Sequence, residues 1–169
     1  SYIVRSIDHI LKTDFGLKDG LADNSKVKLE NEKGEETESH RVLILDPATG
    51  TGTFLHGVVD EVHTRVTGKY GGGVWPQYVR DHLLPRLFGF ELLMAPYAVA
   101  HMKLGIQLQE LKPPYDFAAN ERLGVFLTNT LEEARKVSDL LFARWLSDEA
   151  RAASEIKRER PIMVVLGNP

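Results

Sequence analysis

The stretch ILDPATGTGTFL, residues 44–55, places an acid, a proline and two glycines between two apolar segments. The apolar run that ends before the acid, residues 42–45, is typical of a parallel strand buried on both faces. Gly50 and Gly52 allow the backbone to turn sharply and to approach a ligand closely. The stretch therefore predicts a strand, a tight turn and a helix that is capped by Thr53.

The residues after Gly52 separate this turn from two common phosphate-binding loops. A P-loop needs Gly-Lys-Ser/Thr at this point, but Thr53 and Phe54 follow Gly52, so the P-loop is excluded. A dinucleotide-binding loop needs a third glycine where Leu55 stands, so that interpretation is disfavoured. The glycines alone are also compatible with a strand–helix turn that binds nothing.

The rest of the chain alternates short apolar runs with segments of helical periodicity. Further strands are predicted at RLFGFEL (86–92), LGVFLTN (123–129) and IMVVLGNP (162–169). Helices are predicted over 1–15, from Thr53 to about Arg65, over 75–84, from the turn containing Pro96, and from about Val137 to Arg158, with a loop at TGKYGGG (67–73). Such alternation predicts an α/β fold, a Rossmann-like, doubly wound, mostly parallel sheet with an N-terminal helix.

The periodicity also places apolar residues on one face of two predicted helices. One such face in the first helix carries Ile3, Ile7, Ile10 and Leu11, and one in the helix near Pro96 carries Ala95, Val99, Met102 and Ile106. The polar residues 16–41 predict a surface hairpin around Lys33-Gly34. We therefore divide the chain into residues 1–41, a helix and connecting segment, and residues 42–169, which carry the expected ligand site.

Composition limits the function classes. The chain has 169 residues, no cysteine and a formal net charge of −3, so thiol chemistry is excluded and no global charge favours nucleic acid. No apolar run is long enough to span a membrane, and a cytoplasmic location is expected. His40, His56, His63, His82 and His101 show no metal-binding spacing, so no metal is predicted. The basic residues Arg151, Lys157, Arg158 and Arg160 are interpreted as favourable charge at a helix C-terminus, with a phosphate contact as the alternative.

Ligands of such sheets bind at the carboxyl ends of the strands, near the point where the strand order reverses. The predicted strands end at Asp46, Glu91, Thr128-Asn129 and Gly167-Asn168-Pro169. An acid in the place of Glu91 can accept hydrogen bonds from both hydroxyls of a ribose. The alternative for Glu91 is an exposed carboxylate at a strand end with no ligand.

Two of these segments resemble motifs of S-adenosylmethionine-dependent DNA amino-methyltransferases. DPATGTGTF (46–54) resembles their motif I, and GNP (167–169) resembles the start of motif IV, Asn-Pro-Pro-Tyr/Phe. The resemblance implies a class I methyltransferase sheet, of which four strands are readable here, with S-adenosylmethionine as cofactor. The cofactor-binding residues that it implies are Asp46, Pro47, Ala48, Thr49, Gly50, Thr51, Gly52, Thr53, Phe54, Glu91, Leu92 and Asn129.

By the same resemblance, Asn168 and Pro169 are the catalytic residues. The side-chain oxygen of Asn168 and the carbonyl of Pro169 accept the two N–H bonds of an exocyclic amine on a base that has left the duplex. Direct methyl transfer needs no enzyme nucleophile, and asparagine at the first position favours adenine N6 over cytosine N4.

The segments DPATGTGTFL, GFELLMAPYAVAHMKLGIQL and VVLGNP look most like the methyltransferase region of large single-chain restriction–modification enzymes, the type ISP group. Partners implied by this likeness are DNA and the nuclease, helicase-like and target-recognition regions of one parent chain. Leu92-Leu93 replace the common Ile-Asp, motif X would precede Ser1, and motif IV stops at Pro169. We therefore expect a domain truncated within its catalytic motif, which binds cofactor weakly and does not methylate DNA alone.

Two alternatives stay open. The first is a methyltransferase that acts on RNA or on a glutamine side chain, since these enzymes share Asn-Pro-Pro-Tyr. The second is a nucleotide-binding or structural α/β module without turnover.

Overall fold

The structure is a computed structural model that describes residues 1–30, 36–128 and 141–168, with backbone alone at 30, 141–146, 158 and 159. The predicted sites Asn129 and Pro169 lie outside the described residues. In chain order the elements are α1 (Tyr2–Thr13), a 3₁₀ turn (Gly20–Ala22), β1 (Lys26–Glu30), β2 (Glu36–His40), β3 (Ile44–Asp46), α2 (Thr53–Tyr70), a 3₁₀ turn (Gly72–Val74), α3 (Trp75–Tyr78), a π-helical segment (Val79–Leu83), a 3₁₀ turn (Leu84–Arg86), β4 (Leu87–Glu91), α4 (Met94–Glu110), β5 (Gly124–Leu127), α5 (Leu141–Glu159) and β6 (Val164–Val165).

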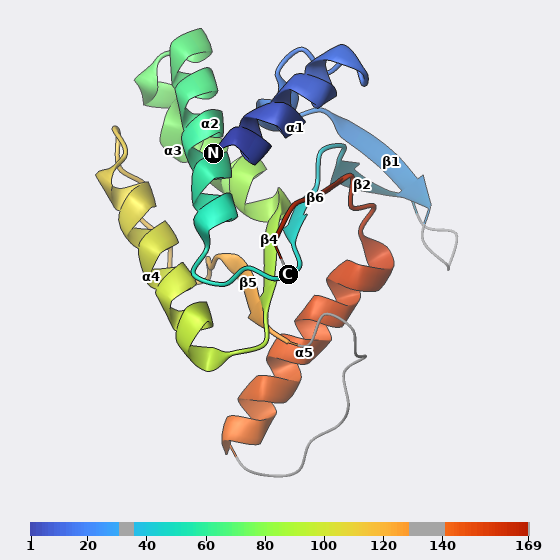
Figure 1. Ribbon diagram of the computed structural model, residues 1–169, viewed down its shortest axis with the longest axis vertical. Coiled ribbons are helices and arrows are strands. Elements are labelled where there is room, and N and C mark those ends of the chain that lie inside the picture. The colour runs from blue at the N-terminus through green and yellow to red at the C-terminus, as the bar shows by residue number, and fades with distance from the viewer. Residues whose placement is uncertain (31–35, 129–140, 169) are drawn as a thin grey trace.

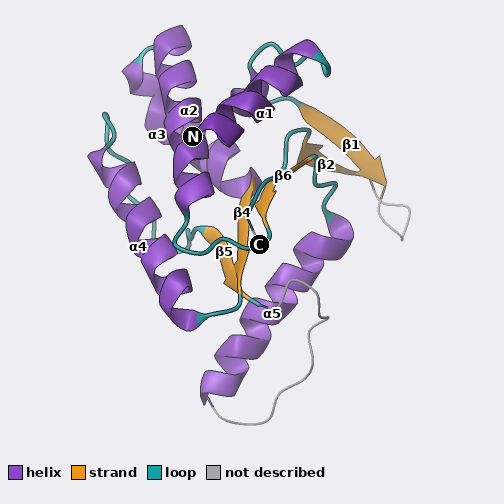
Figure 2. Cartoon of the chain, viewed as in Figure 1, coloured by secondary structure: helices purple, strands orange, loops and turns teal. Residues whose placement is uncertain are grey.

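The main sheet confirms the predicted α/β fold. Its strands run parallel in the order β5-β4-β3-β6 (Figure 2). In β3, Ile44 pairs with Leu87 of β4 on one side and with Val164 of β6 on the other. The chain thus adds strands to one side of β3 and then returns to the other, so the strand order reverses between β3 and β6. This order is consistent with a partial Rossmann-like sheet, and the reversal between β3 and β6 is its switch point.

Helices cover both faces of the sheet (Figure 1). On one face, α1 to α4 enclose the larger core, with Val58, Trp75 and Leu104 fully buried. On the other face, α5 packs Ala153 and Ile156 against a smaller cluster that contains Phe90 and Phe126. Strands buried on both faces explain why the strand sequences are continuously apolar rather than alternating.

The predicted surface hairpin is present. The strands β1 and β2 pair antiparallel, from Lys26 opposite His40 to Glu30 opposite Glu36. The Lys33-Gly34 turn lies outside the described residues. At the base of the hairpin, Nε2 of His40 lies 3.1 Å from Nδ1 of His82, which joins the hairpin to the π-helical segment.

The apolar face of α1 that carries Ile3, Ile7, Ile10 and Leu11 is only partly buried. Ile3 and Ile10 are 43% and 44% exposed, whereas Val4, Asp8 and Leu11 are buried. Asp8 can be buried because its carboxylate accepts hydrogen bonds from the Lys12 ammonium, the Arg65 guanidinium and the backbone N–H of Leu21. An acid with three donors can therefore occupy a position that periodicity assigns to an apolar residue.

The apolar face of α4 that carries Ala95, Val99, Met102 and Ile106 is largely exposed, since Met102 and Ile106 are 58% and 45% exposed and Ala95 is exposed as well. The buried residues are instead Ala100, Leu104, Gln107 and Leu108. Since α4 carries apolar residues on both sides, periodicity could not choose between them. Polar contacts favour the observed side: the Gln107 amide donates to the His56 carbonyl (3.0 Å) and to Asp60 (2.6 Å).

The predicted loop at 67–73 is also wrong in part, because α2 continues to Tyr70. Val66 is buried, and the Thr67 hydroxyl donates back to the His63 carbonyl (2.8 Å), so the helix retains its contacts past Arg65. It ends at Gly71, whose φ of +83° favours glycine. The predicted helix over 75–84 is confirmed, as α3 followed by π-helical and 3₁₀ segments.

Candidate functional site

The turn between β3 and α2 is built on two glycines with positive φ, Gly50 (+55°) and Gly52 (+79°). A side chain at either position would be strained. The N-cap of α2 is Gly52, without a side-chain hydrogen bond, and Thr53 is the first helical residue. The prediction that Thr53 caps the helix is therefore wrong, because the left-handed Gly52 takes the capping position itself.

Glu91, the last residue of β4, holds this turn. One carboxylate oxygen accepts the backbone N–H of Gly50 (2.8 Å) and the other accepts that of Leu93 (2.8 Å). The backbone N–H of Thr49 donates to the Phe90 carbonyl (2.9 Å), so the turn lies against β4 at two points. Each carboxylate oxygen keeps a further lone pair, and the predicted ribose contact of Glu91 stays a prediction.

Gly89 makes this close approach possible. A Cβ at Gly89 would lie 2.5 Å from Oγ1 of Thr49 and 2.9 Å from Cδ1 of Leu55. The Thr49 hydroxyl donates to the Asp46 carbonyl (3.1 Å), which fixes its side chain over β4. Sequence reasoning did not assign a role to Gly89, although a glycine inside an apolar strand signals a close backbone approach.

Asp46, the last residue of β3, is fully buried. Its Oδ1 accepts the backbone N–H of Ala48 (3.1 Å), while its Oδ2 has no hydrogen-bond partner within the described part of the chain. Burial, with a smaller contribution from the Glu91 charge, raises the pKa of Asp46 to about 6. Asp46 therefore offers a carboxylate whose ionised form would be stabilised by a nearby cation or donor.

The chain after β6 reaches the same place from the other side of β3. Leu166 donates to the Leu45 carbonyl (3.0 Å), and a Cβ at Gly167 would lie 3.0 Å from Oδ1 of Asp46. Asn168 follows and is exposed. The structure thus brings Asp46, Gly167 and Asn168 together at the switch point between β3 and β6.

The other predicted site residues that the structure describes are residues 47–54, which follow β3, and Leu92, which follows β4. Pro47 to Gly52 make the turn, in which Thr49 and Gly52 are buried and Thr51 is exposed. Thr53 and Phe54 begin α2, and Leu92, 63% exposed, lies between β4 and α4. All of them are near the carboxyl ends of β3 and β4.

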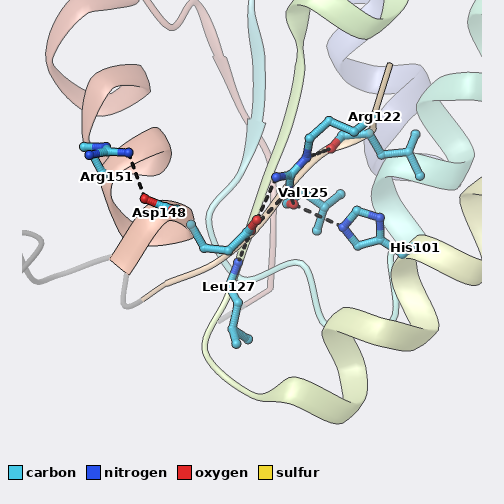
Figure 3. Close-up of polar contacts among 8 residues, drawn as sticks. His101, Arg122, Val125, Leu127, Asp148 and Arg151 are labelled. Atoms are coloured by element: carbon cyan, nitrogen blue, oxygen red, sulfur yellow. Dashed lines mark hydrogen bonds and ion pairs between the residues drawn. The ribbon is translucent and has the colours of Figure 1, made fainter. Parts of the chain in front are cut away.

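A polar network beside this edge was missed by the sequence analysis. Arg122, which precedes β5, pairs with Glu149 of α5, and both bond to the backbone of β5 (Figure 3). No motif or spacing marks these residues, which lie far apart in the chain.

A hollow of about 350 Å³ lies elsewhere, between α2 and α4. Among its lining residues, Gln107 and Asp60 already bond to each other. We place the candidate site at the strand ends because the convergent polar groups are there. No group of three or more metal-ligating side chains occurs among the described residues. Within the same residues, no helix has the length and apolarity needed to cross a membrane.

Comparison with known proteins gives structural neighbours alone, since no family model and no curated protein matches the chain. A nuclease-deletion mutant of the type ISP restriction–modification enzyme LlaGI, in complex with a DNA substrate mimic, has a TM-score of 0.65 and 23% identity over 99% of this chain. The ATP-dependent type ISP enzyme LlaBIII bound to DNA has a TM-score of 0.66 and 23% identity over 99%. The DrdV–DNA complex has a TM-score of 0.60 and 25% identity over 99%.

The chain has the fold of a segment of these enzymes. It spans 12% of the LlaGI chain, 10% of the LlaBIII chain and 13% of the DrdV chain.

Proposed function

We propose that this chain is the S-adenosylmethionine-binding part of a DNA methyltransferase that modifies adenine N6 within a restriction–modification enzyme. The observation that carries the proposal is the meeting of Asp46 with Gly167 and Asn168. The motif I-like and motif IV-like segments are far apart in sequence, yet the strand order places them on adjacent strands. Cofactor binding and chemistry require this proximity.

The residues at the site fit S-adenosylmethionine. Oδ2 of the buried Asp46, which has no hydrogen-bond partner among the described residues, suits the ammonium of the cofactor. The Glu91 carboxylate suits the ribose hydroxyls, and the exposed Leu92 suits one face of the adenine. When bound, the cofactor supplies a methyl group on a positively charged sulfonium.

In the proposal, Asn168 acts on the acceptor amine. Its side-chain oxygen accepts an N–H of the adenine amine, which directs the nitrogen lone pair and offsets positive charge that develops on nitrogen. The exposure of Asn168 suits contact with a base that has left the duplex. The same role for the Pro169 carbonyl stays a prediction, since Pro169 lies outside the described residues.

The neighbouring structures support DNA as the substrate, because all three were solved with DNA or a DNA mimic. The partners expected from the same parent chain, which are nuclease, helicase-like and target-recognition regions, belong to this proposal as well. RNA and glutamine side chains remain alternative acceptors that the assay below distinguishes.

Calorimetry with S-adenosylmethionine, NAD and ATP tests cofactor choice. We expect S-adenosylmethionine to bind and NAD and ATP not to bind. Glu91→Ala should weaken the binding of S-adenosylmethionine by about 1.5–3 kcal/mol, because a charge-assisted hydrogen bond is lost. Binding of NAD or ATP instead would refute the proposal.

In the full-length parent enzyme, transfer of a tritiated methyl group to DNA, RNA and protein then identifies the acceptor. Asn168→Ala should abolish labelling of DNA and leave cofactor affinity unchanged. Labelling that survives this substitution would exclude the role given to Asn168.

A further inference from the structure

The outer edge of β5 is closed by side chains. The Val125 carbonyl accepts hydrogen bonds from Arg122 (3.0 Å) and from Nε2 of His101 on α4 (3.1 Å) (Figure 3). The backbone N–H of Leu127 donates to Oε2 of Glu149 on α5 (3.3 Å). Because Val125 and Leu127 are buried, these groups would otherwise be costly to leave unpaired.

The centre of this closure is a bidentate ion pair. Oε1 of Glu149 lies 2.7 Å from one terminal nitrogen of Arg122, and Oε2 lies 3.1 Å from the other. Glu149 is 3% exposed, so the pair is largely shielded from water on the carboxylate side. The bond to Glu149 raises the pKa of Arg122. Pairs of this geometry are stronger and more directional than single hydrogen bonds.

The pair is connected to the candidate site by successive hydrogen bonds. Leu127 is the last residue of β5, and the backbone N–H of Thr128 donates to the Glu91 carbonyl (2.8 Å). The Glu91 carboxylate in turn holds Gly50. The end of β5 is therefore fixed on its inner side by Glu91 and on its outer side by Glu149.

We infer that Glu149 and Arg122 are positioning residues for the adenosine part of the ligand, because they fix the carboxyl end of β5 beside Glu91. The inference rests on the proposed function, since it presumes that an adenosine-containing ligand binds at this edge. Neither residue touches the ligand. Their role is to keep Thr128 in register with β4, so that the end of β5 stays beside Glu91.

The test compares Glu149→Gln with Asp148→Asn. Asp148 is the adjacent residue on α5, and it pairs with Arg151 on the exposed side of the helix (2.8 Å; Figure 3), so this control also removes one ion-paired acid. Affinity for S-adenosylmethionine and for 5′-methylthioadenosine is measured by calorimetry well below the unfolding temperature. We expect Glu149→Gln to weaken both ligands about tenfold, as for the loss of one charge-assisted bond, and Asp148→Asn to bind like the wild type.

A purely structural role would lower the unfolding temperature and leave the affinity of the folded protein unchanged, which would overturn the inference. Absence of binding by the wild type would refute the proposed function itself, and the inference with it.

Amide hydrogen exchange of the wild type gives a second readout if Glu149→Gln does not fold. Bound 5′-methylthioadenosine should slow exchange at Leu127 and Thr128, and unchanged exchange there would overturn the positioning role.

Discussion

Replacing Glu91 with glutamine should loosen the turn that forms the candidate site. The two carboxylate oxygens of Glu91 each accept one backbone N–H, from Gly50 and from Leu93, at 2.8 Å. Glutamine has one acceptor oxygen, and its NH₂ group must face the second N–H. One of the two backbone N–H groups therefore loses its partner, and because residue 91 is only 9% exposed, water does not readily replace that partner.

The expected loss follows from these contacts. Removing one charge-assisted hydrogen bond costs about 1.5–3 kcal/mol, and converting the other to a neutral bond costs up to about 1 kcal/mol. The free energy of unfolding should fall by about 2–4 kcal/mol in total. For a chain of 169 residues this lowers the unfolding midpoint by about 5–10 °C.

Thermal unfolding followed by circular dichroism measures this loss, and amide exchange shows whether Gly50 and Leu93 become less protected. Glu155→Gln, at an exposed position on α5, serves as the control and should stay within about 0.5 kcal/mol of the wild type. If Glu91→Gln melts with the control and Gly50 exchanges at the wild-type rate, Glu91 does not hold the turn.

Three further predictions concern protonation and packing. Burial raises the pKa of Asp46 from 3.8 to about 6, so the folded state binds the proton more tightly than the unfolded chain. The free energy of unfolding therefore falls by about 2–3 kcal/mol as the pH rises from 4 to 6. Urea unfolding should show this slope in the wild type and not in Asp46→Asn, and equal slopes would contradict it. Burial and the nearby Arg86 lower the pKa of His40 from 6.5 to about 4, so on acidification the unfolded chain is protonated at a higher pH than the folded protein. The free energy of unfolding therefore falls by about 2 kcal/mol as the pH drops from 6.5 to 4. His40→Gln should flatten this loss, and a wild-type titration of the His40 ring near pH 6.5 by NMR would disprove the assignment. Gly167→Ala places a Cβ 3.0 Å from Asp46 and should destabilise the fold by about 1 kcal/mol, whereas unchanged urea unfolding would show that the segment after β6 shifts freely.

The sheet and the convergence of its strand ends were predictable because the carboxyl ends of parallel strands meet at one edge. Short apolar runs identified the four parallel strands, and each predicted run contains the observed strand or overlaps it. Asp46, Glu91 and the segment from Gly167 follow directly from these strand ends. The strands could be found without knowing any tertiary contact, because a continuous apolar run itself indicates a strand that is buried on both faces.

The helix faces and the network around β5 were not predictable in the same way. The buried face of α4 depends on the Gln107 bonds to α2, and that of α1 on the three donors around Asp8. Both cases need partners from other elements. The Arg122–Glu149 pair is likewise a contact between distant parts of the chain. Nothing in the sequence around either residue distinguishes it from a charged residue on the surface.

The two glycines outside the turn explain how Asp46, the acid before the turn, is buried. Gly89 on β4 and Gly167 after β6 flank the turn, and each leaves space that Thr49 or Asp46 fills. This packing buries Asp46, and among the described residues the backbone N–H of Ala48 is the one donor to its carboxylate. The buried acid is therefore costly to ionise, as its raised pKa shows, and a cationic group bound beside it would lower that cost. Affinity for S-adenosylmethionine should consequently rise as pH increases from 5 to 7, and Asp46→Asn should remove the rise. Calorimetry that finds the same pH dependence in both proteins would show that Asp46 does not face the ammonium.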